Sequence, residues 1–322
     1  YLHCDAGIVI SASHNTKEYN GLKCYGPDGG QMTELPAGRV SAAIDTIDLF
    51  RPVTLTFEQA LSQGTVEFIA ESVWQAYYDR IFREAIAPQR VREAGLRVVY
   101  SPLCGAGGEP VSHMLERLGA EYHIPQSQKA PSGEFATCPS PNPENDASFG
   151  ECYKLADEVK PDLIMATDPD SDRIAVAIPT ASGYRKFSGN EMGCLLLQYI
   201  LRAMKDEGKL PHDPVAVKSV VSTPLADRVA AAYGCKMRTV LTGFKYIGGV
   251  ILELEQAGHA DDFVLGFEES CGYLKGDYAR DKDAVVTAML IAEMAASSKL
   301  AGRTLADEMD ALYAQYGCFA AG

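Results

Sequence analysis

Ser13 and His14 lie in a polar segment, SASHNTKEYNGLK, that directly follows the apolar run at 7–10. The β-branched residues of that run predict a short buried strand, so the polar segment is a loop at a strand end. Ligands bind at such strand ends in α/β proteins. Lys23 follows Ser13 by ten residues. The alternative is a solvated turn, because Ser and Asn favour turns through local hydrogen bonds.

Three carboxylates on alternate residues, Asp168, Asp170 and Asp172, follow a second apolar run and precede Arg173. Carboxylates this close repel one another unless a cation or protons intervene. A calcium loop needs Gly at its sixth position and Glu at its twelfth, which here are Arg173 and Pro179. The pattern instead suits Mg²⁺, held by a few carboxylates with positions left open for a phosphate oxygen. A solvated acidic turn is the alternative, although such turns rarely lie between two strongly apolar runs.

A third polar segment, GFEESCGYLKGDYARDKDAV, follows a third apolar run. Glu268 and Ser270 alternate on what is expected to be an extended stretch, so both side chains can point the same way. A carboxylate and a hydroxyl placed together can hold vicinal sugar hydroxyls. Lys275, Arg280 and Lys282 supply positive charge that could meet a phosphate. A solvated loop is the alternative interpretation.

The elements that position these loops alternate along the chain. Apolar runs predict strands at 7–11, 96–101, 162–167, 173–178, 216–222 and 262–267. Apolar residues at three- and four-residue spacing predict helices at 72–87, 110–119, 148–159, 191–206, 224–233, 247–257 and 284–299. Loop-rich stretches are predicted at 51–71, 124–147 and 179–190, and SPLCGAGGEP (101–110) is predicted to connect a strand to a helix. The alternation predicts α/β layers with mixed or parallel sheets.

Composition narrows the class of protein. The 322 residues suffice for two or three domains, and 47% of them are hydrophobic, so a sizeable core is available. The net charge of −14 disfavours a nucleic-acid partner, although a locally basic cleft would still accept a small anion. No apolar run is long enough to span a membrane, and no signal peptide is recognisable. Because the first residue is not Met, we expect a fragment whose natural start lies upstream.

Cysteine usage and missing motifs exclude further classes. The nine cysteines are odd in number and none has CxxC spacing, which predicts reduced, mostly buried thiols in a cytoplasmic protein. No Walker A pattern and no Gly-x-Ser-x-Gly elbow is present. P-loop nucleotide hydrolysis and an α/β-hydrolase mechanism are therefore excluded.

Together, and in this order, the three loops resemble those of the α-D-phosphohexomutase family, which includes phosphoglucomutase and phosphomannomutase. The matching motifs are Ala12-Ser13-His14-Asn15 followed by Tyr19-Asn20-Gly21-x-Lys23, then Asp168-x-Asp170-x-Asp172-Arg173, then Glu268-Glu269-Ser270. LTGFKYIG (241–248) is similar to a segment of the family's third domain. The chain departs from the family pattern at Thr16, Pro169, Ser171 and Cys271, none of which removes a functional atom.

The resemblance implies a fold of consecutive, similar α/β domains with mixed sheets sandwiched by helices and the active site at the domain junction. It places the end of domain I at 1–57, domain II at 58–184 and domain III at 185–322. It also implies that an upstream segment with an arginine-bearing loop and a fourth, C-terminal domain are not part of these 322 residues.

The resemblance further implies catalytic roles. Ser13 would be the phosphoserine, Lys23 a general acid/base and Arg173 a phosphate contact, with His14 among the catalytic residues. The expected ligands of Mg²⁺ are Ser13, Asp168, Asp170 and Asp172. Glucose 1,6-bisphosphate would be the activating intermediate between a hexose 1-phosphate and a hexose 6-phosphate.

Substrate contacts follow from the same resemblance. Glu268 and Ser270 would hold sugar hydroxyls, and Thr242, Gly243 and Lys282 would contact the substrate. The Glu-Glu-Ser motif is associated with glucose phosphates. Phosphomannomutase activity, phosphopentomutase activity, a metal-dependent phosphatase and an inactive fragment that only binds metal or sugar phosphate stay open. The expected partner is a small sugar phosphate, and the sequence does not indicate an oligomeric state.

Overall fold

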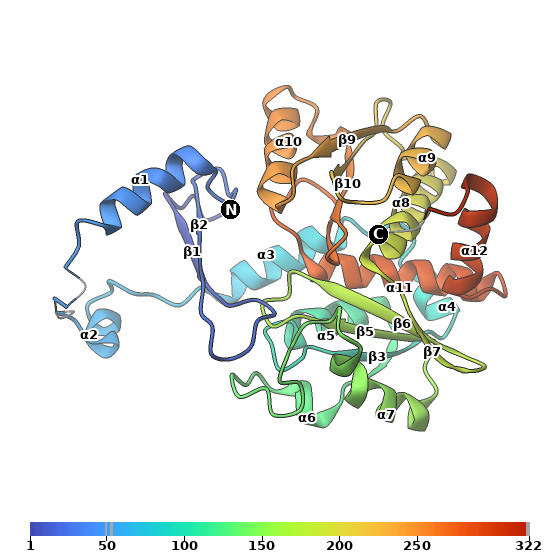
Figure 1. The fold of residues 1–322 in the computed structure, drawn as a ribbon, viewed down its shortest axis with the longest axis horizontal. Coiled ribbons are helices and arrows are strands. Elements are labelled where there is room, and N and C mark those ends of the chain that lie inside the picture. The colour runs from blue at the N-terminus through green and yellow to red at the C-terminus, as the bar shows by residue number, and fades with distance from the viewer. Residues whose placement is uncertain (49, 52–53, 320–322) are drawn as a thin grey trace.

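The computed structural model describes residues 1–48, 50–51 and 54–319. The chain forms an N-terminal unit to one side of two α/β layers that share a central helix (Figure 1). Residues 52–53 of the loop predicted at 51–71 and residues 320–322 of the predicted third domain lie outside the described residues.

The N-terminal unit contains an antiparallel two-stranded ribbon. Its elements are β1 (Gly7–Ile10), β2 (Leu22–Tyr25), α1 (Glu34–Ile44) and α2 (Phe57–Ser62). The prediction that β1 is buried is wrong, because Ile8 is 66% exposed and Ile10 is 64% exposed. In the described part of the chain β1 pairs only with β2, and its β-branched side chains are left facing solvent.

A five-stranded mixed sheet carries the second polar loop. In spatial order its strands are β4 (Glu121–His123), β3 (Arg97–Ser101), β5 (Leu163–Thr167), β6 (Ile174–Thr180) and β7 (Gly183–Lys186). The strands β3, β4 and β5 are parallel, whereas β6 and β7 are antiparallel to their neighbours. The three longer strands were predicted, but the two short edge strands were not, because their sequences EYH and GYRK contain no apolar run.

Short and medium helices accompany this sheet. They are α3 (Glu71–Phe82), α4 (Gln89–Glu93), α5 (Gly108–Leu118), α6 (Gln126–Lys129), the 3₁₀ helix η1 (Asp146–Phe149) and α7 (Gly150–Val159). The single helix predicted at 72–87 is wrong in extent, since α3 ends at Phe82 and α4 begins after Pro88. Pro88 is the N-cap residue of α4, and the short connection at 83–87 separates the two helices.

A four-stranded sheet carries the third polar loop. In spatial order its strands are β11 (Gly272–Leu274), β10 (Phe263–Glu268), β8 (Val215–Ser219) and β9 (Lys236–Val240). The strands β8, β9 and β10 are parallel, and β11 returns antiparallel to β10. Its helices are α8 (Gly189–Asp206), α9 (Leu225–Ala232), α10 (Phe244–Gln256), the 3₁₀ helix η2 (Ala260–Asp262), α11 (Ala284–Leu300) and α12 (Leu305–Tyr316).

Two predicted boundaries can be compared with these elements. The strand predicted at 216–222 ends at Ser219, because the Ser222 amide donates to the Ser219 carbonyl and starts a turn. The domain boundary predicted after residue 184 falls inside β7, which belongs to the five-stranded sheet. The domain limits themselves stay predictions.

Helix α11 is the shared centre of the two layers. It runs between the two sheets (Figure 1) and contacts α4, α5, α8, β5 and β11. Almost all of its residues are buried, which is typical of a helix that is apolar on every side. No single helix in the described residues is long and apolar enough to cross a membrane, and α11 with α12 passes that test only as a pair bent by 86°.

One charged side chain of α11 is fully buried. Glu293 Oε2 accepts hydrogen bonds from the Ile86 amide (3.1 Å), the Ala87 amide (2.9 Å) and the Tyr199 hydroxyl (3.1 Å). Burial raises the pKa of Glu293, and these three donors oppose that rise. The carboxyl group therefore fastens the α3–α4 connection and α8 to the central helix.

We expect Glu293→Ala to lower the free energy of unfolding by about 3 kcal/mol, because it leaves three buried donors without an acceptor. Urea denaturation of the variant and the parent measures this loss. Glu253→Ala on α10 is the matched control, since Glu253 forms only an exposed ion pair with Arg238 and should change stability by less than about 0.5 kcal/mol. Equal losses in the two variants would contradict the prediction.

Candidate functional site

The loop after β1 meets the loop between β5 and β6. Ser13 Oγ donates to Asp168 Oδ2 at 3.0 Å, although the two residues are 155 positions apart in the chain. Ser11 Oγ donates to Asp170 Oδ2 at 3.0 Å. The structure therefore brings the serine loop and the aspartate cluster, predicted from separate segments, into direct contact.

Ser13 adopts a backbone conformation that non-glycine residues rarely use. Its φ is 52°, and its amide donates to Ser11 Oγ at 2.8 Å. Its hydroxyl lies 3.2 Å from His14 Nδ1. Burial and the nearby positive charge of Arg173 hold the pKa of His14 below its usual value. Left-handed backbone at a non-glycine residue often marks a functional site, and here it belongs to the serine that faces the carboxylates.

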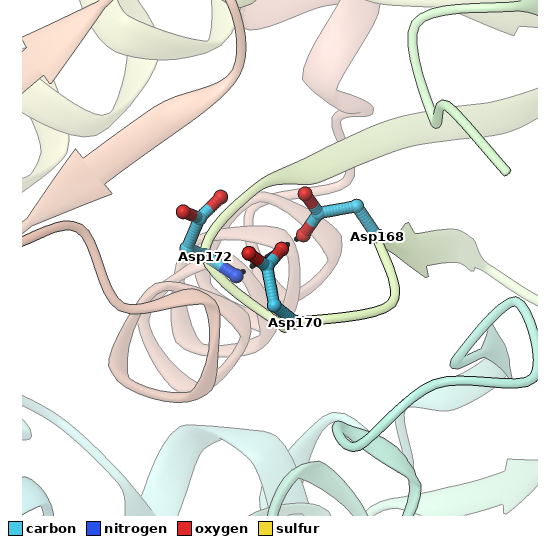
Figure 2. A group of neighbouring side chains, drawn as sticks. All are labelled: Asp168, Asp170 and Asp172. Atoms are coloured by element: carbon cyan, nitrogen blue, oxygen red, sulfur yellow. Dashed lines mark hydrogen bonds between the residues drawn. The ribbon is translucent and has the colours of Figure 1, made fainter. Parts of the chain in front are cut away.

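The loop between β5 and β6 carries Asp168, Asp170 and Asp172 (Figure 2), and Asp168 is fully buried. Asp168 Oδ1 accepts the amides of Asp172 (3.1 Å) and Arg173 (2.9 Å). One oxygen from each of Asp168, Asp170 and Asp172 lies within 4.8 Å of the others. Burial, and then the charges of Asp172 and Asp170, raise the pKa of Asp168 well above its ordinary value.

Two lysines partly balance this negative charge. Lys23 Nζ lies 3.1 Å from Asp170 Oδ2 and 2.9 Å from Asp172 Oδ2. Lys282 Nζ lies 2.9 Å from the same Asp172 oxygen. Burial opposes the charge of Lys23, but Asp172 and Asp170 outweigh it and raise the pKa of Lys23. The same balance, with Asp172 as the main opposing charge, raises the pKa of Lys282.

The donor set fits Mg²⁺. All the available atoms are oxygens, which magnesium prefers as ligands. Within the described residues, the buried Oδ1 atoms of Asp170 and Asp172 have no hydrogen-bond partner. Buried polar atoms normally have one, so these two oxygens are ready to coordinate a cation. Asp168, Asp170, Asp172 and the Ser13 hydroxyl are the residues that could hold it.

The third polar loop is the turn between β10 and β11. Glu268 is buried at the end of β10, and its Oε1 accepts the Gly243 amide at 2.7 Å. Burial raises the pKa of Glu268, although that amide opposes the rise. The backbone φ of 117° at Gly243 favours glycine, and Thr242 beside it is exposed. Glu268 and the 242–243 segment therefore meet at one end of the four-stranded sheet.

The prediction that Glu268 and Ser270 alternate on one extended stretch is wrong. Glu268 pairs with Gly272 across an antiparallel hairpin, so Ser270 lies in the turn that joins the two strands. Cys271 closes the turn with a φ of 64°. The shared direction of the two side chains therefore cannot be argued from strand alternation.

The hairpin is joined directly to the aspartate loop. The Ile174 amide donates to the Cys271 carbonyl at 3.0 Å, and the Ala284 amide donates to the Ser171 carbonyl at 3.1 Å. Arg173 and Gly272 form an isolated antiparallel bridge. The metal-binding candidates and the sugar-binding candidates are thus parts of one hydrogen-bonded framework.

Arg173 projects toward the Pro-rich loop at 124–147, which contains Glu144. Its Nη1 lies 3.0 Å from Glu144 Oε1, and its Nε lies 3.9 Å from Asp172 Oδ1. That Nε is buried and has no hydrogen-bond partner in the described residues. The contact of Arg173 with a phosphate stays a prediction.

Two of the predicted cations are used elsewhere. Lys275 Nζ forms a buried ion pair with Glu84 Oε2 at 2.6 Å. Arg280 Nε donates to the Asp28 carbonyl at 2.9 Å, and its guanidinium pairs with Glu255. The expectation that these two meet a phosphate is not supported, because both charges are already neutralised within the fold.

Sequence reasoning missed three residues at the site. Ser11 contacts Asp170, and its place two residues before Ser13 was the available signal. Asp281 accepts the Tyr25 hydroxyl at 2.8 Å and lies beside Lys282. Glu144, the partner of Arg173, lies in a loop whose composition predicted only irregular structure.

The connection at 101–110 braces the aspartate loop. The Ala106 amide donates to the Pro169 carbonyl at 2.8 Å. A Cβ on Gly105 would lie 2.3 Å from the Pro169 Cα, which is too close for any side chain. As predicted, this segment joins a strand, β3, to a helix, α5.

We expect Gly105→Ala to displace the aspartate loop, because the new methyl group overlaps backbone rather than a movable side chain. The predicted effects are a loss of about 1–3 kcal/mol in unfolding free energy and about tenfold weaker Mg²⁺ binding. Urea denaturation and calorimetric Mg²⁺ titration measure them. Gly133→Ala, where a Cβ meets nothing within 4 Å, is the control and should change neither quantity. Unchanged Mg²⁺ affinity in Gly105→Ala would contradict the proposed bracing.

Comparison with known proteins assigns the family. Models of the phosphoglucomutase/phosphomannomutase α/β/α domains match in chain order: domain I at 1–50, domain II at 75–183 and domain III at 188–316. The chain belongs to the phosphoglucomutase/phosphomannomutase family. The fold of mixed sheets flanked by helices agrees with the fold expected from the sequence.

Comparison with individual members of the family shows what share of their length this chain covers. It is 33% identical to a phosphoglucomutase of Staphylococcus epidermidis over 321 residues, covering 99% of this chain and 57% of that protein. The structure of a putative phosphomannomutase from Thermus thermophilus has a TM-score of 0.76 at 22% identity, covering 98% of this chain and 64% of that one. An N-acetylphosphoglucosamine mutase of Aspergillus fumigatus, solved with GlcNAc-6P and magnesium, has a TM-score of 0.60 at 16% identity over 95% of this chain and 72% of that one. The chain therefore spans a little over half the length of the curated phosphoglucomutases that it matches.

Proposed function

We propose that the chain carries the serine, metal and sugar sites of an enzyme that interconverts a hexose 1-phosphate and a hexose 6-phosphate. The observation that carries the proposal is the 3.0 Å contact between Ser13 Oγ and Asp168 within the oxygen-lined aspartate cluster. A serine that exchanges a phosphoryl group must be open to substrate and lie beside a cation site, because phosphoryl transfer depends on positioning and charge neutralisation. Relatives named phosphoglucomutase support the same reaction.

Each residue then has a part in the transfer. The Ser13 hydroxyl exchanges the phosphoryl group with the sugar oxygen. Lys23, which reaches both Asp170 and Asp172, is placed to hold or move a proton at the reacting oxygen. Bound to the aspartates, Mg²⁺ would supply neutralisation of the phosphate charge. Arg173 and Lys282 add positive charge for the phosphate, while His14 contacts the serine oxygen.

The sugar is held at the end of the four-stranded sheet. Glu268 and Gly243 meet at this end, and together with Ser270 and Thr242 they would bind the hydroxyls of a glucose phosphate. The reaction passes through glucose 1,6-bisphosphate, so the same groups must accept the sugar in two orientations. The Aspergillus mutase solved with GlcNAc-6P and magnesium supports a sugar phosphate and a magnesium ion as the ligands of this fold.

A second candidate function is binding of metal and sugar phosphate without turnover. It is favoured by length, because the chain covers only 57% of the Staphylococcus epidermidis phosphoglucomutase. Remote binding energy drives the chemical step, so if groups outside these 322 residues complete the substrate site, the 322 residues alone should turn over slowly. All nine cysteines are unpaired and six are buried, which supports the predicted reducing, cytoplasmic compartment.

A coupled assay tests the proposal. Glucose 1-phosphate is supplied with Mg²⁺ and glucose 1,6-bisphosphate, and glucose 6-phosphate formation is followed for the 322-residue chain and for the full-length natural protein. We expect turnover by the full-length protein and weak turnover at most by the chain. Mannose 1-phosphate and ribose 1-phosphate test the alternative mutases, and release of free phosphate tests the phosphatase. Absence of mutase turnover in the full-length protein would refute the proposal.

A further inference from the structure

Glu269, the middle residue of the Glu-Glu-Ser turn, is fastened to another strand. Its Oε2 accepts the Ser219 hydroxyl at 2.7 Å and the Ser222 hydroxyl at 3.4 Å. The two hydroxyls also lie 2.8 Å from each other. Ser219 ends β8 and Ser222 follows it in the next turn, and both are buried. A carboxylate that receives two hydroxyl groups forms a strong, oriented contact.

The neighbouring glutamate is fastened to a third loop. Glu268 Oε1 accepts the Gly243 amide at 2.7 Å, at the start of α10. The two adjacent glutamates therefore tie the β10–β11 turn to the ends of both β8 and β9. Three loops at one end of the four-stranded sheet are joined through these two carboxylates.

The turn also contacts two further elements. A Cβ on Gly189, at the first turn of α8, would lie 1.9 Å from the Glu269 carbonyl oxygen. The Cys271 carbonyl accepts the Ile174 amide from the strand that follows the aspartate loop. The turn is thus held on one face by the α8 backbone, on another by β6 and on a third by the two buried serines.

We propose that Glu269 is a positioning residue of the sugar site, which acts through Ser219 and Ser222 to set the placement of Ser270 and Glu268. This inference rests on the proposed sugar-phosphate function and deepens it. One oxygen of Glu269 accepts both serine hydroxyls. Through this contact Glu269 orients the turn that presents the sugar-binding groups. Loss of the tether frees the turn and weakens substrate binding more than it slows the chemical step.

The test compares four variants of the full-length natural protein. We expect Glu269→Ala to raise the KM for glucose 1-phosphate about tenfold, the loss typical of one charged hydrogen bond, with kcat changed much less. Glu269→Gln keeps an oxygen that accepts from Ser219, so it should restore most of the affinity. The double variant Ser219→Ala/Ser222→Ala should reproduce the KM of Glu269→Ala, and combining all three changes should add little, because the three side chains act as one unit.

Controls separate positioning from other roles. Ser298→Ala removes a buried hydroxyl that donates to Glu308 at 3.2 Å, away from the site, and should leave KM unchanged. A melting temperature that falls while KM stays at the parent value would show a purely structural role and overturn the proposal. If Glu269→Ala raises KM but the serine variant does not, Glu269 contacts the sugar directly and the proposal also fails.

The design keeps this inference distinct from the proposed function. If the parent protein shows no mutase turnover, the proposed function fails, and the dissociation constant for glucose 6-phosphate, measured calorimetrically with Mg²⁺, replaces KM as the readout. A tenfold weaker dissociation constant in Glu269→Ala then supports the positioning role without catalysis. Absence of glucose 6-phosphate binding by the parent protein overturns both.

Discussion

Ser13→Ala is expected to lower mutase turnover by at least about 1000-fold, because Ser13 is the proposed nucleophile and removing a nucleophile that acts with neighbouring groups abolishes most of their joint effect. The Ser13 hydroxyl contacts Asp168 at 3.0 Å and lies 3.2 Å from His14. No other serine in the described residues has both of these neighbours. Alanine keeps the Cβ and removes only the oxygen that would carry the phosphoryl group. The coupled glucose 1-phosphate assay on the full-length protein measures the loss.

Peptide mass spectrometry provides an independent measurement of the same role. After incubation with glucose 1,6-bisphosphate and Mg²⁺, the parent protein should gain a phosphate on the peptide that contains Ser13. Ser41→Ala, which removes an exposed hydroxyl from α1, is the matched control and should keep both turnover and the phosphate. A phosphate found on another residue, or normal turnover in Ser13→Ala, would refute the role of Ser13.

Removal of Mg²⁺ should have a comparably large effect. Asp168, Asp170 and Asp172 place three carboxylates within 4.8 Å, and two lysines alone do not neutralise them together with an incoming phosphate. Chelation of the metal should therefore abolish turnover, and added Mg²⁺ should restore it. Asp170→Asn removes one charge while leaving an oxygen for the Ser11 hydroxyl, so it should weaken Mg²⁺ binding by at least about tenfold.

Calorimetric Mg²⁺ titration of the chain measures that affinity without relying on activity. Asp213→Asn makes the same change of charge at an exposed position that pairs with Lys236, and it should leave the affinity unchanged. Equal Mg²⁺ affinity in Asp170→Asn and the parent would show that the cluster is not the metal site. In that case Lys23, rather than a metal ion, would balance the charge of Asp170 and Asp172.

The sequence predicted the main elements because their signals are local. The buried strands β3, β5 and β6 have continuous apolar runs, and α5, α7 and α8 have apolar residues at helical spacing. The short edge strands β4 and β7 lack such a pattern. Each has a neighbouring strand on one side only, and each forms because it pairs with that neighbour. The wrong expectation for β1 has the same origin, because β-branched residues report strand propensity and not what covers the strand.

For the site, the sequence alone determined which chemical groups are available and that each polar loop follows a strand, because residue type and strand ends are local properties. The tertiary structure decided which groups meet: Ser13 with Asp168, Lys23 and Lys282 with Asp172, and Glu269 with Ser219. The tertiary structure also pairs Lys275 with Glu84, so Lys275 does not supply the positive charge that the sequence predicted for a phosphate. These contacts join residues far apart in the chain, and local periodicity carries no information about distances across such separations.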